Sequence, residues 1–272
     1  MNKPAFLLVA LLISFGIVVP GGAFASGGAD VRMEPAPVNR LDAPSLQRGA
    51  RNFVNYCLNC HSAKYMRYQR LTDLGVDSSM IQDNLMFASN KIGDTMVAAM
   101  SPADAKAWFG VQPPDLSVIA QVRGSDWLYN YFLGFYRDDK SASGWNNLVF
   151  PNVAMPHVAW QLSGAGKLVE TEYEDHEKAI AGAIATKGLA KLEPGKGGKW
   201  LLLTVQPDPD APGAMTPVQY QLWVADLVNY LDYMAEPNKN KRISLGIMVL
   251  IYLAVLFTFA YALKRSYWKD VH

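Results

Sequence analysis

The 272-residue chain contains only two cysteines. They are separated by two residues, and a histidine directly follows the second one, as Cys57-Leu58-Asn59-Cys60-His61. This is the C-x-x-C-H pattern by which c-type haem is attached to a polypeptide. Two thiols at this spacing on one turn reach the two vinyl groups on one side of a porphyrin, and the adjacent histidine then faces the iron. The motif predicts one covalent haem c, bound at Cys57 and Cys60, with His61 as an iron ligand.

A disulfide or a redox-active thiol pair is the other interpretation of these cysteines. Export to an oxidising compartment favours disulfides, and a C-x-x-C pair is also typical of thioredoxin-like proteins. Such a protein places the pair near the start of a βαβ unit. Here a predicted helix leads into Cys57 and no βαβ unit follows, so a haem-free thiol oxidoreductase is the weaker alternative.

The second axial ligand has to come from another part of the chain, and the sequence favours Met155. Two prolines, Pro151 and Pro156, keep this stretch non-helical and stiff enough to hold a thioether against a haem. A methionine ligand stabilises ferrous iron and raises the reduction potential, as suits an acceptor late in an electron-transfer chain. His157 is the rival ligand; otherwise it is an ordinary hydrogen-bonded histidine beside the site. Five other methionines are expected to fill the core: Met66, Met80, Met86, Met96 and Met100.

Both ends of the chain carry segments that are separate from the folded domain. Residues 1–25 have the layout of a secretory signal peptide, in which a basic residue and an apolar run precede small residues at the cleavage point. Residues 244–263 are apolar, lie between basic flanks and are long enough to cross a membrane once. We therefore expect an exported domain at residues 26–238 and a cytoplasmic tail at residues 264–272. In a bacterium the domain would lie in the periplasm and the anchor in the inner membrane.

The predicted exported domain is acidic. Residues 26–238 contain 18 Lys and Arg against 23 Asp and Glu, although the whole chain carries a formal charge of +1. Nucleic acid is excluded as a partner because it requires a basic face, and a basic or neutral protein partner is favoured. Five of the acids crowd into residues 170–177, where they form either a docking patch or a solvated loop.

Apolar periodicity predicts a mainly α fold. Ser45 can cap a helix whose apolar residues recur at helical spacing as far as Cys57, so this helix should lead straight into the motif. A second helix is expected over residues 126–135. The stretch between them is mixed, with helix-compatible segments at residues 80–88 and 102–108 and no convincing strand.

The last helix of the exported domain has the strongest signals. Thr216 is its expected N-cap, Pro217 occupies the first helical position, and Gln219 completes a capping box. Apolar residues then follow the 3.6-residue period as far as Glu236-Pro237, where the helix should end.

Residues 163–213 are rich in Gly, Lys and Glu and contain several prolines. This composition predicts an insertion or a long loop. One short helix is expected at residues 178–185, and residues 200–205 could form a strand.

The chain resembles the cytochrome c1 family, the haem subunits of the quinol:cytochrome c oxidoreductase (bc1) complex. The likeness covers nearly all of the predicted exported domain and the tail, and its ordered motifs are more specific than the haem motif alone. The motifs are YCLNCHS at residues 56–62 with Arg67 and Tyr68, PPDLS at 113–117, FPNVAMP at 150–156, and residues 216–237 followed by one apolar span.

The resemblance implies that the haem accepts one electron from the Rieske iron–sulfur protein and passes it to a cytochrome c, while cytochrome b holds the complex in the membrane. It also implies that Arg123 pairs with a haem propionate and that Pro114 packs on the ring; a solvated surface arginine is the alternative for Arg123. Residues 107–112 differ from the Asn-rich turn that the family has before its double proline. Trp127 stands where the family has a tyrosine, and residues 163–213 form a longer stretch than the family pattern.

The predicted function is therefore one-electron transfer in a bc1 complex, with no residue acting as a general base or nucleophile. A stand-alone, membrane-tethered cytochrome c is the alternative. A long flexible linker would favour such a carrier. Only a few residues separate Pro237 from the predicted span, which favours a fixed subunit close to the membrane.

Overall fold

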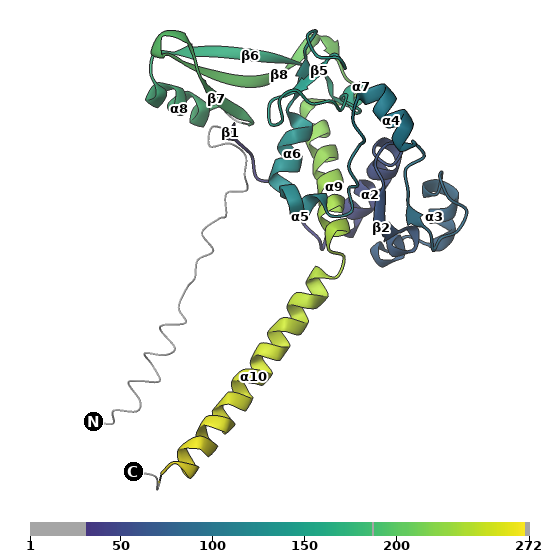
Figure 1. The fold of residues 1–272 in the computed structure, drawn as a ribbon, viewed down its shortest axis with the longest axis vertical. Helices are drawn as coiled ribbons and strands as arrows, with labels where there is room; N and C mark the ends of the chain where they lie inside the picture. The colour runs from purple at the N-terminus through teal and green to yellow at the C-terminus, as the bar shows by residue number, and fades with distance from the viewer. Residues whose placement is uncertain (1–30, 187, 270–272) are drawn as a thin grey trace.

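The computed structural model describes residues 31–186 and 188–269, so the predicted signal peptide at residues 1–25 lies outside the described residues. Figure 1 shows a mainly helical domain with one long helix projecting from it, which confirms the predicted fold class.

The helices are α2 (Ala43–Tyr56), α3 (Ser78–Leu85), α4 (Pro102–Phe109), α5 (Ile119–Arg123), α6 (Ser125–Leu133), α7 (Trp160–Ser163), α8 (His176–Ala185), α9 (Pro217–Ala235) and α10 (Lys239–Tyr267), with 3-10 turns η1 (Tyr68–Leu74) and η2 (Lys196–Gly198). The strands are β1 (Val31–Arg32), β2 (Ala63–Arg67), β3 (Thr95–Met96), β4 (Phe135–Arg137), β5 (Trp145–Asn147), β6 (Gly164–Tyr173), β7 (Ala190–Pro194) and β8 (Trp200–Pro212).

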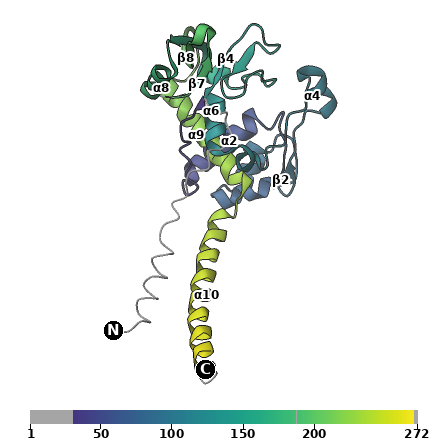
Figure 2. The same ribbon diagram turned by 60° about the vertical axis from the view of Figure 1, so that its left-hand side comes forward.

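Helices α2 and α9 lie side by side at the centre of the domain (Figures 1 and 2). Gly49 permits their close approach, because a β-carbon at this position would lie 2.1 Å from the carbonyl oxygen of Asp226 and 2.6 Å from Cβ of Tyr230. Glycine is the residue that allows two backbones to approach this closely. Beside this contact the rings of Phe53 and Tyr230 pack with their centroids 5.7 Å apart.

Helix α2 begins three residues earlier than the sequence predicted, so Ser45 as its N-cap was wrong. The cap is Asp42, whose carboxylate accepts a hydrogen bond from the Ser45 amide at 3.0 Å. Pro44 in the first turn agrees with this earlier start, because proline fits only the beginning of a helix. Ser45 is instead buried, and its hydroxyl accepts a hydrogen bond from Asn229 of α9. The predicted apolar face is confirmed, since all of its members are buried: Leu46, Ala50, Phe53 and Cys57.

The other predicted helices are confirmed as α3, α4, α6 and α9. Helix α9 has the predicted capping box, in which the Gln219 amide donates to the Thr216 hydroxyl at 3.3 Å and the Thr216 amide donates to the Gln219 side chain at 2.9 Å. The expectation of no strand in residues 62–110 was wrong, because β2 pairs with the two-residue strand β3. Strand β2 directly precedes η1 and β3 follows α3, and both strands are too short to show an apolar alternation.

Most of residues 163–213 form an antiparallel sheet, so the prediction of a long loop was wrong there. The strand order is β1-β7-β8-β6. The predicted helix is present as α8 and the predicted strand as the first half of β8. Five buried residues give this sheet and α8 a small core of their own: Ala179, Ala183, Ala190, Leu192 and Leu202. In both ribbon views the sheet lies at the end of the domain opposite α10.

The prolines of β8 explain why its second half did not look like a strand. Proline cannot donate to a β-ladder and is confined to strand edges. Strand β8 pairs with β7 only over Trp200–Thr204, whereas Pro207 and Pro212 pair with β6 alone. The proline-containing half therefore has one neighbour and tolerates the missing donors.

Helix α10 is long and apolar enough to cross a membrane and contains the predicted span of residues 244–263. Its best window has a mean hydropathy of 2.5, and none of that window is buried against the rest of the chain. It follows α9 after only residues 236–238. Such an apolar, unburied helix requires lipid or other membrane helices around it.

Candidate functional site

Cys57 directly follows α2, and the chain turns sharply after it. The backbone amides of Cys60 and His61 both donate to the Cys57 carbonyl, at 3.0 and 2.8 Å. Cys57 is 4% exposed, and the two cysteines do not form a disulfide with each other. This single turn brings Cys57, Cys60 and His61 to one wall of a cavity.

The cavity measures about 340 Å³, within the range of roughly 300–1,000 Å³ that is usual for small-molecule and cofactor sites. It lies between the end of α2, the double-proline segment, α5, α6 and the segment that contains Met155. All of the site residues expected from the sequence line it: Cys57, Cys60, His61, Pro114, Arg123 and Met155. Apolar side chains make up most of the remaining wall: Leu116, Ile119, Leu128, Phe132, Val153 and Leu231.

The His61 ring is oriented by a hydrogen bond to the backbone. Its Nδ1 lies 2.7 Å from the carbonyl oxygen of Pro114. A carbonyl only accepts, so Nδ1 carries the proton and Nε2 keeps its lone pair, which is the form that binds a metal. Burial also lowers the pKa of His61 and keeps the ring neutral.

The segment that carries Pro114 is held by Asp115. This carboxylate accepts hydrogen bonds from the backbone amides of Lys64 at 3.0 Å and Ser117 at 2.8 Å. The sequence implied only that Pro114 packs on a ring. Its carbonyl contact with His61 is an additional role that the side-chain pattern could not reveal.

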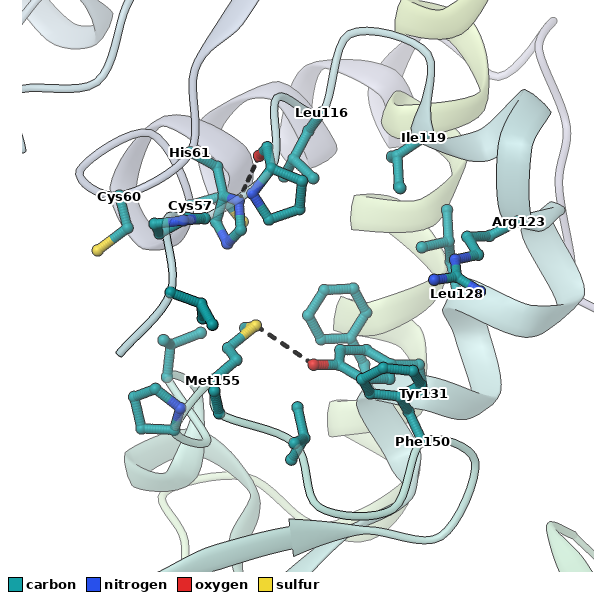
Figure 3. A pocket seen from close by; sticks show the side chains of 18 of the residues that line it. Cys57, Cys60, His61, Leu116, Ile119, Arg123, Leu128, Tyr131, Phe150 and Met155 are labelled. Atoms are coloured by element: carbon teal, nitrogen blue, oxygen red, sulfur yellow. Dashed lines mark hydrogen bonds between the residues drawn. The ribbon is translucent and has the colours of Figure 1, made fainter. Parts of the chain in front are cut away.

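Met155 approaches from the opposite side of the cavity. Figure 3 shows its sulfur and the His61 ring facing the same space from two walls. The Tyr131 hydroxyl of α6 donates a hydrogen bond to this sulfur at 3.4 Å. The cavity therefore presents an imidazole nitrogen on one side and a thioether on the other.

Two asparagines of β5, which the sequence analysis missed, hold the segment that carries Met155. Asn147 is fully buried and donates to the carbonyl of Tyr131 at 2.7 Å. Asn146 accepts from the amide of Asn152 at 2.8 Å, where the backbone has a φ of 59°. The sequence signal that could have indicated this role is the polar pair Asn146-Asn147 just before the segment that carries Met155.

His157 does not line this cavity. It is 3% exposed, stacks on Phe135 with ring centroids 4.7 Å apart, and has Nε2 2.8 Å from the Ser163 hydroxyl. Burial and the nearby Arg137 lower its pKa to about 3. Although His157 is only two residues from Met155, it faces the interior between the helices and the sheet. This placement favours the ordinary hydrogen-bonded role over iron ligation.

Arg123 lies at the other end of the cavity from the cysteines (Figure 3). Its guanidinium carbon is 4.9 Å from the Trp127 ring centroid and 5.7 Å from that of Phe150. Arginine stacks on aromatic faces while its donors stay available. Trp127 therefore packs against the guanidinium with its ring face.

Of the five methionines expected in the core, the structure buries Met66 and Met96 fully. Met86 and Met100 are half-buried, and Met80 is exposed on α3. None of these methionines lines the cavity. Met155 is thus the one methionine among the described residues that lines it.

These residues fit a haem. The apolar walls suit a porphyrin, a neutral imidazole and a thioether are both groups that can ligate iron, and the guanidinium suits a carboxylate. In Figure 3 the Cys60 sulfur points away from the cavity, so a thioether there requires rotation about its Cα–Cβ bond.

Burial raises the pKa of Cys57 to about 12 and also raises that of Cys60. Reactive redox thiols have lowered pKa values, so this environment opposes a thiol oxidoreductase.

The fold and the site together define a haem-binding electron-transfer protein with a single membrane anchor. Comparison with known families agrees with this class. The chain belongs to the cytochrome C1 family, whose model matches residues 34–187 and 215–271. It is thus a haem-carrying, electron-transfer subunit of the bc1 type. The residues that the family model leaves unmatched, 188–214, include β7 and β8, which lie within the predicted insertion.

Individual relatives match most or all of the chain. An "Ammonia monooxygenase gamma subunit" of Nitrosomonas europaea is 43% identical over 272 residues, which is all of both chains. A cytochrome c1 of Allochromatium vinosum is 40% identical over 96% of this chain and 98% of its own length. A cytochrome c1 of Rhodospirillum rubrum is 27% identical over 85% of this chain and 84% of its own length.

Proposed function

We propose that this chain carries one haem c, bound through thioethers at Cys57 and Cys60, with His61 and Met155 as axial ligands. In this proposal it accepts one electron from the Rieske iron–sulfur protein and donates it to a cytochrome c, within a complex that also contains cytochrome b. The observation that carries the proposal is the pairing of an imidazole nitrogen and a thioether across one apolar cavity beside C-x-x-C-H. A bound haem supplies a reversible one-electron couple.

The protein's contribution on the histidine side is orientation. The Pro114 carbonyl fixes the tautomer and the angle of the His61 ring, and a hydrogen bond of this kind makes the ligating nitrogen more basic. Asp115 holds that carbonyl in place through two backbone amides. This wall is therefore preorganised before any partner binds.

On the methionine side the protein controls the reduction potential. A thioether ligand stabilises ferrous iron, and apolar walls that exclude water favour the form with less charge. The walls next to Met155 are apolar, with the Tyr131 hydroxyl as a polar exception. This arrangement suits an acceptor of relatively high potential.

Arg123 is proposed to pair with a haem propionate. Two observations favour this pairing. Arg123 lies at the end of the cavity remote from the cysteines, and its guanidinium packs on the Trp127 ring. A guanidinium can hold a carboxylate through two parallel hydrogen bonds. The positive charge would partly offset the negative charge of the propionate beside the redox centre.

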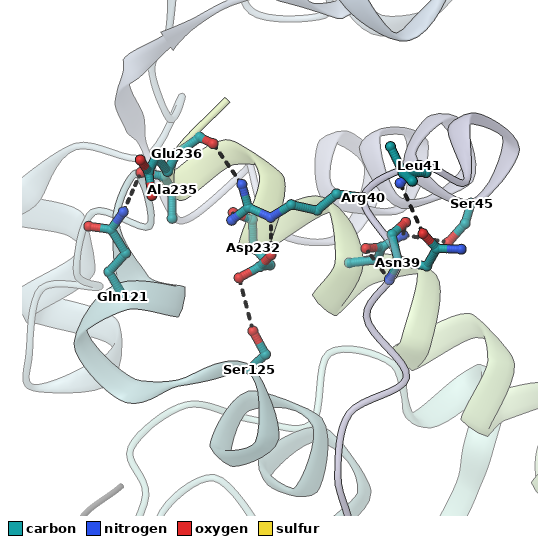
Figure 4. A network of polar contacts seen from close by, with 10 residues as sticks. Asn39, Arg40, Leu41, Ser45, Gln121, Ser125, Asp232, Ala235 and Glu236 are labelled. Carbon is teal, nitrogen blue, oxygen red and sulfur yellow. Dashed lines mark hydrogen bonds and ion pairs between the residues drawn. The ribbon is translucent and has the colours of Figure 1, made fainter. Parts of the chain in front are cut away.

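The joint between the haem domain and α10 favours a fixed subunit over a tethered carrier. Figure 4 shows that Asp232 near the end of α9 pairs with Arg40 and accepts a hydrogen bond from Ser125 at 3.2 Å. Arg40 also donates to the Glu236 carbonyl at 2.7 Å, and Gln121 donates to the Ala235 carbonyl at 3.1 Å. Four parts of the chain thus meet at the end of α9, and the Glu236 carboxylate pairs with Arg242 of α10 across the short connection, which favours a fixed position of the domain on its anchor.

The orientation follows from the predicted signal peptide. Its export places residues 26–238 on the periplasmic side of a bacterial inner membrane and residues 264–272 on the cytoplasmic side. An orientation test is direct: protease added to spheroplasts should degrade the haem domain, whereas protease added to inside-out vesicles should leave it intact. The opposite result would reverse the proposed topology.

Purification of the chain from its native membranes in mild detergent tests the proposed partners. Cytochrome b and the Rieske protein are expected to co-purify, and quinol should reduce the haem of this chain in the isolated complex. A known quinol analogue that blocks the complex is the control. Isolation of a monomeric cytochrome that no quinol reduces would favour the stand-alone carrier.

The relative named as an ammonia monooxygenase subunit suggests a second partner for the same redox chemistry. That protein matches this chain over its full length, so the electron-transfer role could serve a monooxygenase complex. The same purification separates the two proposals. Recovery of a monooxygenase without cytochrome b would favour the second one.

A further inference from the structure

Asn147 connects two walls of the cavity. Its Nδ2 donates to the carbonyl of Tyr131 on α6 at 2.7 Å. Its Oδ1 accepts from the amides of Val149 and Phe150, at 2.9 and 3.1 Å, in the segment that leads to Met155. The side chain is fully buried. One asparagine therefore joins the helix that carries Tyr131 to the segment that carries Met155.

Tyr131 completes the connection at the other end. Its hydroxyl donates to the Met155 sulfur at 3.4 Å. Its ring stacks on Trp127 with centroids 4.9 Å apart and meets Phe135 edge-on at 5.1 Å. These contacts fix the ring, with its hydroxyl directed at the sulfur.

We propose that Asn147 is the positioning residue for the Met155 ligand, and that Tyr131 directs the thioether by a hydrogen bond to its sulfur. This inference rests on the proposed ligation of iron by Met155. A thioether sulfur has two lone pairs, so one would be available to iron while the other accepts the hydrogen bond from the hydroxyl. The donor then withdraws charge from the sulfur, which favours the ferrous form.

Loss of the asparagine side chain should weaken the methionine ligand specifically. Without Oδ1, the amides of Val149 and Phe150 lose their acceptor in a partly buried segment, and an unsatisfied amide there is costly. The segment can recover those hydrogen bonds by moving toward water, away from the cavity. The population with Met155 detached from iron should then rise about tenfold.

The chain offers a matched control in Asn229 of α9. This asparagine is 1% exposed and also makes three hydrogen bonds, two with the backbone of Asn39 and one with the Ser45 hydroxyl. It does not contact the segment that carries Met155. Its loss should destabilise the fold without affecting the iron ligand.

The test uses the full chain, matured with haem in membranes, as wild type and as Asn147→Ala, Tyr131→Phe, Asn229→Ala and Met155→Leu. The readouts are the charge-transfer band of methionine-ligated ferric haem, the reduction potential, and the affinity for added imidazole. Asn147→Ala is expected to weaken the band and to raise imidazole affinity about tenfold. Tyr131→Phe should keep the band but lower the potential, and Asn229→Ala should match the wild type in all three readouts.

The variants distinguish failure of this inference from failure of the proposed ligand. If Met155→Leu abolishes the band while Asn147→Ala and Asn229→Ala both retain it with unchanged imidazole affinity, Met155 is the ligand but Asn147 does not position it. If Met155→Leu itself keeps the band, the ligand assignment is wrong. If Asn147→Ala does not accumulate, Tyr131→Phe decides alone, and an unchanged potential overturns the proposed hydrogen bond.

Discussion

The two walls of the cavity are built in different ways. The His61 wall comes from five consecutive residues at the end of α2, and its ligand is fixed by one backbone hydrogen bond. The Met155 wall comes from a separate segment that lies against α6, and side-chain hydrogen bonds from β5 and α6 hold it. The cysteines and the histidine of the first wall lie on one turn, and haem attachment would hold them covalently; the Pro114 carbonyl is the contact from a distant part of the chain. The second depends on tertiary structure and is the place where the redox properties can be adjusted.

The largest expected effect concerns the covalent wall. Replacement of both cysteines, as Cys57→Ala with Cys60→Ala, should abolish covalent haem completely because no other cysteine exists in the chain. The measurement is haem absorbance that remains with the polypeptide after acid–acetone extraction. Met155→Leu is the control, since it leaves both attachment sites intact. Extraction-resistant haem in the double variant would contradict the attachment sites.

The next effect concerns the ligand of the other wall. Met155→Leu should keep covalent haem but lower the reduction potential by on the order of 100 mV or more, because axial ligands set haem potentials over a wide range. The iron should also bind added carbon monoxide. Met66→Leu is the matched control, since Met66 is 1% exposed and does not line the cavity. A native potential in Met155→Leu would assign the ligand to another residue.

A smaller effect is expected at the cavity end. Arg123→Gln should lower the potential by some tens of millivolts, because removal of a positive charge favours ferric haem and solvent screens the interaction. Arg137→Gln is the control: Arg137 also stacks on a tryptophan, 4.1 Å from the Trp145 ring centroid, but does not line the cavity. Equal potentials in the two variants would identify Arg123 as an ordinary surface arginine.

The smallest effect on electron transfer is expected from charge reversal in the acidic stretch of residues 170–177 at the end of β6. In residues 170–177, Glu172 pairs with Lys199 and Glu174 lies 3.0 Å from Lys178. Because nearby lysines offset these charges, reversal of Glu170, Glu172 and Glu174 to Lys should change the rate of cytochrome c reduction at low salt by less than about twofold. A severalfold slowing that disappears at high salt would place the docking patch on this surface.

The sequence predicted the cavity's local wall better than its tertiary wall. C-x-x-C-H specifies its own geometry, because all of its groups lie on one turn. Met155 could be selected from the prolines around it. The contribution of Asn147 and Tyr131 could not be predicted, because it depends on β5 and α6 meeting in space.

The same distinction applies to the fold. Helices α2 and α9 were predictable from apolar periodicity and caps, although the start of α2 was misplaced because both Asp42 and Ser45 are capping residues. The sheet was missed because its strands are amphipathic, glycine-rich or proline-containing and are stabilised by pairing with distant partners. Nothing local in residues 163–213 indicates which strands pair. Strand β1, which joins the same sheet, lies more than 130 residues earlier in the sequence.

Intact-mass measurement of the chain purified from its native membranes tests the central claim most directly. The account predicts the mass of the processed polypeptide plus one haem, with both cysteines unreactive toward a thiol reagent. An unmodified polypeptide mass, with Cys57 and Cys60 free or joined to each other, would contradict it.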